Sequence, residues 1–311
     1  MKRCTFDITY NHDSANMGEV FHLTLCGVND EKVTLELNEK QYTLIESRIT
    51  RSFYVRCAKD KILSEIDNAG NHATLENIAK KYYLCDACSF DGINLYGIKR
   101  LLKVIVEVLY KYPKLRSKLC FIGTHHAMER LLVKMEQGDK EILNNFNLQY
   151  ICSTENAEKL GGIAHSILTR LIDEHERYVA TAMCAFGLLD AVLLDKNDYE
   201  GYAYLEFISG LRKNEAMGFH PKGCHTPESV IYHELGHLLD DMCGLSESAD
   251  FKTYYDTLTA DDIEYGLSEY ACTSPKEFIA EAFAEYMCNP KARPIATRVG
   301  ELLNKAYMES S

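Results

Sequence analysis

Two histidines four residues apart, with a glutamate between them, are the residues of this chain best suited to chemistry. They belong to the segment His233-Glu234-Leu235-Gly236-His237. Residues four apart on a helix share a face, so the two imidazoles can converge on one cation. Glu234 points in another direction and can reach a water molecule bound to that cation. The spacing therefore predicts a zinc site that carries its own general base.

The flanking residues predict that this segment lies within a helix. Thr226 is a candidate N-cap, Pro227 suits the first helical position, and Glu228 adds negative charge to the first turn. We expect the helix to end at about Met242, before Gly244. Apolar residues surround the histidines, as a metal site with restricted access to water requires. They are Val230, Ile231, Leu235, Leu238 and Leu239. The alternative is a core helix whose two histidines are merely hydrogen-bonded.

A catalytic zinc site needs three protein ligands, so two histidines are not enough. A second helix, predicted to start at Ser274 and Pro275, carries Glu277, Glu281 and Glu285 on one face. Glutamates stacked in this way repel one another, and a bound cation would reverse that penalty. We expect Glu277 or Glu281 to be the third ligand. The alternative is that all three glutamates face solvent.

Three further residues concern the surroundings of the site. Ala280 and Ala284 are small, which lets the second helix approach the first closely. Asp240 follows His237 by three residues and has two possible roles. It either orients a zinc-bound histidine, as second carboxylates often do, or caps a neighbouring backbone group.

These motifs resemble those of a known family. The residues in His233–Gly244, Tyr270 and the run Glu277–Phe283 are similar to the peptidase domain of anthrax lethal factor and the related Pro-Pro endopeptidases. They also resemble zinc-peptidase-like domains attached to phage minor head proteins, where a stretch like Gly218–Cys224 precedes the zinc helix. The resemblance covers roughly residues 218–290, under a quarter of the chain.

The resemblance implies a zincin-like fold of the gluzincin type and particular roles for residues. It assigns the third ligand of one catalytic Zn²⁺ to Glu277 and gives Glu281 a supporting role outside the ligand set. It also implies that Tyr270 donates a hydrogen bond to the oxyanion, which suits a phenol because its pKa of about 10 keeps it protonated at neutral pH. Glu234 would accept a proton from the attacking water and pass it to the leaving amine.

Composition excludes several classes of protein. Hydrophobic residues make up 46% of the 311 residues, which argues against disorder and allows one large or two modest domains. The net charge of −12 argues against duplex nucleic acid or an anionic membrane as the main partner, and leaves a protein or peptide substrate. From the lack of a long apolar run we expect neither a secretory signal nor a membrane span. We expect a cytoplasmic protein, unless a dedicated export route or packaging into a phage particle moves it.

The twelve cysteines are scattered through apolar segments, which favours free buried thiols over a disulfide framework. Cys85 and Cys88 form the one close pair and could be half of a zinc ribbon or a redox pair. The neighbours Cys224 and His225 are interpreted as part of a loop. The adjacent histidines at positions 125 and 126 cannot converge on one metal and are interpreted as structural.

The periodicity of apolar residues predicts both helices and strands. Strands are expected over Thr5–Tyr10, Val20–Leu25, Lys32–Leu37, Leu119–Ile122, Val179–Phe186, Ala191–Asp195 and Tyr202–Ile208. Helices are expected over Asp60–Ile66, Leu75–Tyr82, Gly97–Lys111, His126–Met135 and Ile163–Glu174. The strand expected over Tyr202–Ile208 could pair with an extended substrate, or it could be a simple hairpin arm.

We therefore expect an α+β protein in two parts. Residues 1–95 form a β-rich N-terminal region with short helices, and residues 96–311 form a zincin-like metallopeptidase domain with a mixed sheet and an active-site helix. The expected function is that of a zinc-dependent endopeptidase. One alternative is a non-proteolytic, zinc-stabilised module that binds phage structural proteins in a head or portal assembly. The other is a lethal-factor-like effector that acts on a host protein. A structural zinc site fills its fourth position with a protein ligand, so Glu234 and Tyr270 favour catalysis.

Overall fold

The computed structural model describes residues 5–11, 20–26, 32–38, 58–137, 180–183, 190–194 and 201–310. The chain divides into two compact units, Met1–Tyr54 and Val55–Ser311. The boundary expected near residue 95 falls within the larger of these two units. The reason is burial, because the helices between residues 58 and 81 place fully buried side chains such as Ile62 and Leu75 in the core of the larger unit.

The N-terminal unit contains a three-stranded antiparallel sheet in the order β1-β2-β3. Its strands are β1 (Thr5–Asn11), β2 (Val20–Cys26) and β3 (Lys32–Asn38), which confirms the three strands predicted there. The register sets apolar residues of the three strands opposite one another, as in the row Ile8, Leu23 and Leu35. A shift of one residue would break these rows, so the alternating pattern specifies the register.

The larger unit contains a four-stranded mixed sheet in the order β4-β5-β7-β6. Strands β4 (Ala87–Ser89), β5 (Phe121–Thr124) and β7 (Ala191–Leu194) are parallel, and β6 (Ala180–Met183) pairs antiparallel with β7. All residues of β5 and β7 are buried. Such continuous apolar runs are typical of parallel strands covered on both faces. The expected mixed sheet is confirmed, and with it an α+β composition.

Helices surround this sheet where the sequence predicts them. Residues 58–68 are helical, followed by α2 (His72–Lys81), α3 (Leu95–Lys111), the 3-10 turn η1 (Pro113–Lys118) and α4 (His125–Glu136). Asn94 caps α3 by accepting a hydrogen bond from the backbone N–H of Tyr96 at 2.9 Å. The helix expected over 163–174 lies outside the described residues.

Residues 201–217 form one helix, α7 (Gly201–Met217), which corrects the strand predicted over Tyr202–Ile208. The apolar residues of this segment fit both periodicities. In the structure Tyr204 and Leu211 are buried and Phe207 is half-buried, a spacing of three and four residues that is typical of a helix. A helix presents no free strand edge, so the substrate pairing considered for this segment is wrong.

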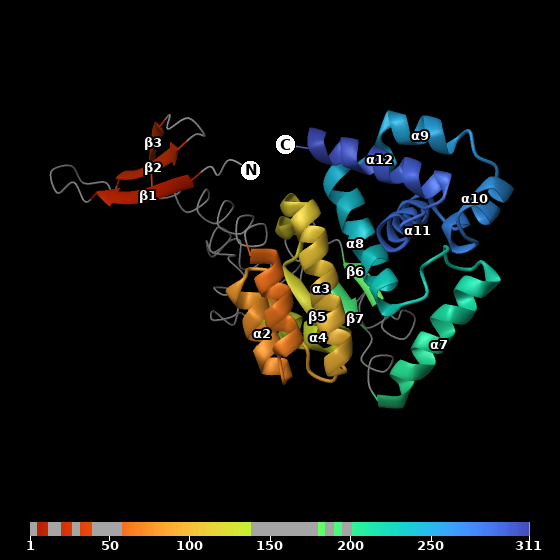
Figure 1. Cartoon of the computed structure of the whole chain (residues 1–311), viewed down its shortest axis with the longest axis horizontal. Coiled ribbons are helices and arrows are strands. Elements are labelled where there is room, and N and C mark those ends of the chain that lie inside the picture. Colours follow the sequence, from red (N-terminus) through yellow and green to blue (C-terminus); the bar gives the residue numbers. More distant parts are fainter. Residues whose placement is uncertain are drawn as a thin grey trace. The chain divides into compact units, whose positions relative to one another are not determined.

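The chain ends in a helical region. It consists of α8 (Pro227–Cys243), the 3-10 turn η3 (Leu245–Glu247), α9 (Ala249–Tyr255), α10 (Ala260–Gly266), the 3-10 turn η4 (Tyr270–Cys272), α11 (Pro275–Cys288) and α12 (Pro294–Glu309). Figure 1 shows α9 to α12 gathered beside α8, and α11 packs directly on α8. No helix in the described ranges is both long and apolar enough to cross a lipid bilayer.

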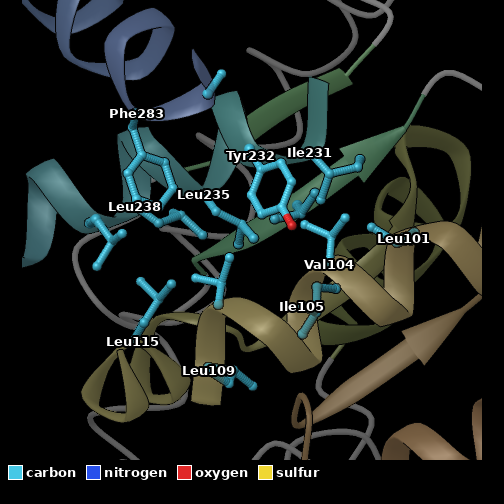
Figure 2. Packing of buried hydrophobic residues seen from close by; sticks show 14 of the residues in the cluster. Leu101, Val104, Ile105, Leu109, Leu115, Ile231, Tyr232, Leu235, Leu238 and Phe283 are labelled. Atoms are coloured by element: carbon cyan, nitrogen blue, oxygen red, sulfur yellow. The ribbon is translucent and has the colours of Figure 1, made fainter. Parts of the chain in front are cut away.

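The core holds α8 in place from the side opposite its histidines. Figure 2 shows apolar side chains of α8 facing those of α3, with Phe283 of α11 nearby. The α8 residues are Ile231, Tyr232, Leu235 and Leu238, and the α3 residues are Leu101, Val104, Ile105 and Leu109. Full burial of one large apolar side chain stabilises a fold by about 1.5–3 kcal/mol. This packing therefore fixes the rotation of α8 and the direction of its polar face.

Candidate metal centre

Helices α8 and α11 approach each other closely at Gly236, the residue before His237. A Cβ placed on Gly236 would lie 3.1 Å from the Cα of Ala280 and 3.2 Å from Cδ1 of Phe283. Ala280 and Ala284 are both buried. The prediction that small residues let the two helices come together is confirmed. The close approach brings the histidine face of α8 onto the glutamate face of α11.

Three ligand atoms from these helices face one point. His233 Nε2 and His237 Nε2 are 3.1 Å apart, and Glu277 Oε2 lies 3.1 Å from the first and 3.3 Å from the second. Tetrahedral zinc with ligands at about 2.0–2.1 Å requires ligand atoms about 3.3–3.4 Å apart. The observed triangle is close to one face of such a tetrahedron. Among the described residues this is the one group of three such side chains that could hold a metal ion.

The Glu277 carboxylate lies within ion-pair distance of both ring nitrogens. Its Oε2 atom is buried and has no hydrogen-bond partner in the described part of the chain, despite the two nitrogens close to it. Burial raises the pKa of Glu277, but the imidazoles of His233 and His237 outweigh burial and hold the pKa well below its usual range. An ionised carboxylate that faces two ring nitrogens is a suitable donor set for zinc.

The start of α11 positions Glu277. The side chain of Ser274 caps the helix by accepting a hydrogen bond from the backbone N–H of Glu277 at 3.1 Å, and Pro275 occupies the first turn. Both features agree with the sequence prediction. Helix α8 likewise begins at Pro227 after the N-cap Thr226, although the Thr226 side chain makes no capping hydrogen bond.

Glu281 lies behind His233, on the side away from the triangle. Its Oε1 is 2.8 Å from His233 Nδ1, and its Oε2 accepts a hydrogen bond from Ser268 Oγ at 2.9 Å. Burial alone would raise the pKa of Glu281, but hydrogen bonds from His220 and His233 lower it to about 2. The carboxylate is therefore ionised and can only accept, so His233 Nδ1 carries a proton. The lone pair on His233 Nε2 is left for a metal.

The third glutamate of this face, Glu285, has a different partner. It is fully buried, and its Oε2 lies 2.7 Å from Arg293 Nη2. Arg293 also donates its backbone N–H to Glu285 Oε1 at 2.8 Å. Glu281 and Glu285 thus each have hydrogen-bonding partners, and Glu277 faces the two imidazoles of the triangle. The alternative of three solvent-facing glutamates is wrong.

Glu234 is buried between α8 and the sheet. Its Oε2 accepts a hydrogen bond from the backbone N–H of Ala182 on β6. Burial raises the pKa of Glu234, although His233 and His237 offset part of the effect. A carboxylate whose pKa is shifted toward neutrality is a better general base than an exposed one.

Asp240 lies near the end of α8. Its Oδ1 accepts a hydrogen bond from the backbone N–H of Ser246 at 2.7 Å. The chain reverses between them at Gly244, whose φ of 64° is in the left-handed region that glycine adopts without strain. Two roles were considered for Asp240, and this contact is the one expected of a residue that caps a backbone group.

Tyr270 lies next to the triangle. Its ring centroid is 5.9 Å from that of His233, with the rings tilted by 32°, and 5.4 Å from that of Phe219. The backbone N–H of Tyr270 donates to the carbonyl of Phe219 at 3.2 Å. The ring of Tyr270 therefore lies between Phe219 and the imidazole of His233 in the order of these contacts.

A cavity of about 470 Å³ opens beside these residues. Its walls include His220, His233, Glu234, Tyr270 and Glu281. The apolar part of the lining comes from strand β6, helices α7, α8 and α11, and the loop between α7 and α8. Its residues are Ala180, Phe207, Leu211, Phe219, Val230 and Ala284. The arrangement can therefore bind an apolar group next to a buried base.

Sequence reasoning missed part of this site. The segment of α7 was expected beside the substrate as a strand, because its first half has the alternation of a strand, and its helical form was missed. His220 belongs to the segment Gly218–Cys224, which the resemblance singled out without a role. Ser268 carried no signal at all, since its contact joins a loop residue to Glu281 of α11, thirteen positions further along the chain.

The cysteines do not form a second centre among the described residues. Free thiols are present at Cys85, Cys88, Cys120, Cys224, Cys243, Cys272 and Cys288. Three of them, Cys85, Cys120 and Cys224, are buried as expected, while the others are half-buried or, for Cys272, exposed. A hydrogen bond with Cys88, together with burial, raises the pKa of Cys85 well above its usual range. A protonated buried thiol is a poor metal ligand and a poor nucleophile.

No protein-family model, curated protein or solved structure matches this chain. The described residues define the site by themselves: two imidazoles and a carboxylate face one point, and a buried glutamate, a tyrosine and an apolar cavity lie beside them.

Proposed function

We propose that the protein is a zinc-dependent endopeptidase of the gluzincin type, with a zincin-like fold in its larger unit. The observation that carries the proposal is the triangle of His233 Nε2, His237 Nε2 and Glu277 Oε2, with sides of 3.1, 3.1 and 3.3 Å. The fold proposal is supported by α8, which carries the histidines and contacts β6, the antiparallel edge strand of the mixed sheet.

The residues of the site divide the chemistry among them. A bound Zn²⁺ ion would supply Lewis acidity and lower the pKa of a coordinated water to about 7. Glu234 accepts a proton from the attacking water and delivers it to the leaving amine. The N–H of Ala182 holds the Glu234 carboxylate against β6 between these two transfers. Tyr270 donates its O–H to the oxygen of the scissile carbonyl as negative charge develops there.

The substrate we propose is a protein or peptide. The cavity beside Glu234 has room for a large side chain and is lined mainly by apolar groups. The net charge of −12 argues against nucleic acid as the partner. The substrate sequence is left to experiment.

A non-proteolytic, zinc-stabilised module of a phage assembly is the main alternative. A structural zinc site is closed by four protein ligands. The candidate group in the described residues has three, and the buried Glu234 lies nearby. These two features favour hydrolysis over a purely structural clamp. A lethal-factor-like effector would share the same chemistry and differ only in its substrate.

The test compares wild-type protein with Glu234→Gln, which keeps the size of the side chain and removes its basicity. Zinc content is measured by elemental analysis, and cleavage is measured on a peptide library, with and without a chelator. We expect about one zinc per chain in both proteins, and a loss of cleavage of about 10²–10⁴-fold in the variant. Equal cleavage by both proteins, or a wild-type protein that binds zinc and cleaves no peptide, would refute the proposal.

A further inference from the structure

The segment between α7 and α8 is fastened to the turn that carries Tyr270. The backbone N–H of Glu269 donates to the carbonyl of Gly218 at 3.0 Å, and that of Tyr270 donates to the carbonyl of Phe219 at 3.2 Å. Gly218 itself adopts a φ of 82°, which a residue with a side chain rarely adopts. These contacts hold His220, the next residue along, in a defined position.

His220 contacts two residues of the candidate centre without belonging to the triangle. Its Nδ1 lies 3.3 Å from Glu281 Oε2. Its ring meets the ring of Tyr270 edge to face, with centroids 5.9 Å apart and an angle of 78°. His220 also lines the cavity. His220 therefore contacts both the Glu281 carboxylate, which lies behind His233, and the ring of Tyr270, which lies beside His233.

The contact with Glu281 matters because that carboxylate is almost completely buried, with 3% of its side chain exposed. Oε1 is occupied by His233 Nδ1, while Oε2 is shared by Ser268 Oγ and His220 Nδ1. A buried carboxylate without enough donors rotates or protonates to find new partners. Either change removes the acceptor that sets the orientation of the His233 ring.

The other two glutamates of α11 have partners of a different kind from those of Glu281. Glu285 has Arg293 as its partner, and Glu277 faces the two Nε2 atoms of the triangle. Glu281 faces no arginine or lysine in its described contacts. Its donors come from two histidines and one serine.

We propose that His220 is a positioning residue of the centre: it holds Oε2 of Glu281, so that Oε1 keeps the His233 ring turned with Nε2 toward the metal. The inference rests on the proposed function only in taking zinc as the ion that the triangle binds. His220 acts through Glu281 and is not itself a ligand.

The experiment uses three substitutions of His220 in the full chain and measures zinc affinity by competition with a chromophoric chelator. In His220→Asn, the side-chain amide nitrogen occupies roughly the place of Nδ1, the atom that contacts Glu281. In His220→Gln, the amide reaches roughly the place of Nε2 instead. His220→Ala removes both ring nitrogens. His126→Ala, at a histidine with 56% of its side chain exposed on α4, is the matched control.

We expect His220→Ala and His220→Gln to weaken zinc binding by about 10-fold, the lower end of the effect of removing a partner of a ligating histidine, because His220 acts on His233 through Glu281. His220→Asn and His126→Ala should stay within about threefold of wild type. The visible spectrum of the Co²⁺-substituted protein should change in the first two variants and be preserved in the last two. Melting of the metal-free proteins identifies any variant that fails to fold.

Equal affinities for the Asn and Gln variants, or wild-type affinity in His220→Ala, would overturn the role of His220. Such a result leaves the peptidase proposal intact if wild type still cleaves peptides. The expected pattern of affinities without peptide cleavage supports the role of His220 and refutes the peptidase proposal. A wild-type protein that binds no zinc refutes both.

Discussion

Gly236 and Ala280 lie so close that a Cβ on Gly236 would come within 3.1 Å of the Ala280 Cα. The contact joins the turn of α8 between His233 and His237 to the turn of α11 between Glu277 and Glu281. The separation of these helices sets the distance between the imidazoles and the carboxylate. A residue with no side chain is therefore part of what determines the geometry of the site.

Gly236→Ala should destabilise the protein by about 1–3 kcal/mol, because the added methyl group forces apart two closely packed helices. It should also weaken zinc binding. Gly210→Ala is the matched control, since Gly210 lies within α7 and a Cβ there meets nothing within 4 Å. The control should be neutral or stabilising by up to about 1 kcal/mol, the ordinary gain of alanine over glycine in a helix. Urea denaturation of the metal-free proteins measures both, and equal effects would contradict the close approach.

Glu277→Gln and Glu285→Gln should separate metal binding from folding, although both residues lie on the same face of α11. Zinc at about 1,000 times its Kd should stabilise wild type by about 4 kcal/mol. Glu277→Gln should lose most of this increment, and it should destabilise the metal-free protein less than Glu285→Gln does, because the Glu277 side chain is 23% exposed and that of Glu285 is fully buried. Glu285→Gln should lower stability by about 3–5 kcal/mol with or without zinc, because it leaves Arg293 without its buried partner. Melting temperature as a function of zinc concentration distinguishes the two, and identical responses would count against the assignment of Glu277.

Tyr270→Phe should keep the zinc content of wild type and lower kcat by about 10²–10³-fold, the usual effect of removing one oxyanion donor. The phenylalanine ring preserves the packing against His233 and Phe219. Tyr265→Phe, at a tyrosine that is 77% exposed on α10, should leave kcat unchanged. Steady-state kinetics on a peptide identified from the library provide the measurement. An unchanged kcat in Tyr270→Phe would exclude the phenol from the reaction.

Glu281 should make the stability of the metal-free protein depend on acidic pH. Its folded pKa of about 2 lies below the ordinary value of 4.5, so folding favours the ionised form. The contribution is present above about pH 4.5 and is lost as the pH falls through about 2. Glu281→Gln should therefore be less stable than wild type at pH 6 and should lose less stability between pH 4.5 and pH 2. Denaturation curves across this range test the prediction, and parallel curves for the two proteins would refute it.

Local patterns in the sequence determined the parts of this protein that depend on neighbours along the chain. The four-residue spacing of His233 and His237 places both imidazoles on one side of any helix that contains them. The capping residue Ser274 and the left-handed Gly244 likewise mark helix ends through bonds to nearby backbone groups. The three N-terminal strands were predictable for the same reason, because alternation is a local property.

Only the tertiary structure decided which side chains from different elements meet. Periodicity left Glu277 and Glu281 equivalent, and the packing of α11 on α8 sets one before the imidazoles and the other behind them. Alternating apolar residues left α7 ambiguous between strand and helix until burial against the core selected the helix. The donors to Glu281 from His220 and Ser268 were equally hidden, because long-range contacts depend on how whole elements pack. Spacing along the chain specifies the face of a helix, and packing specifies what that face meets.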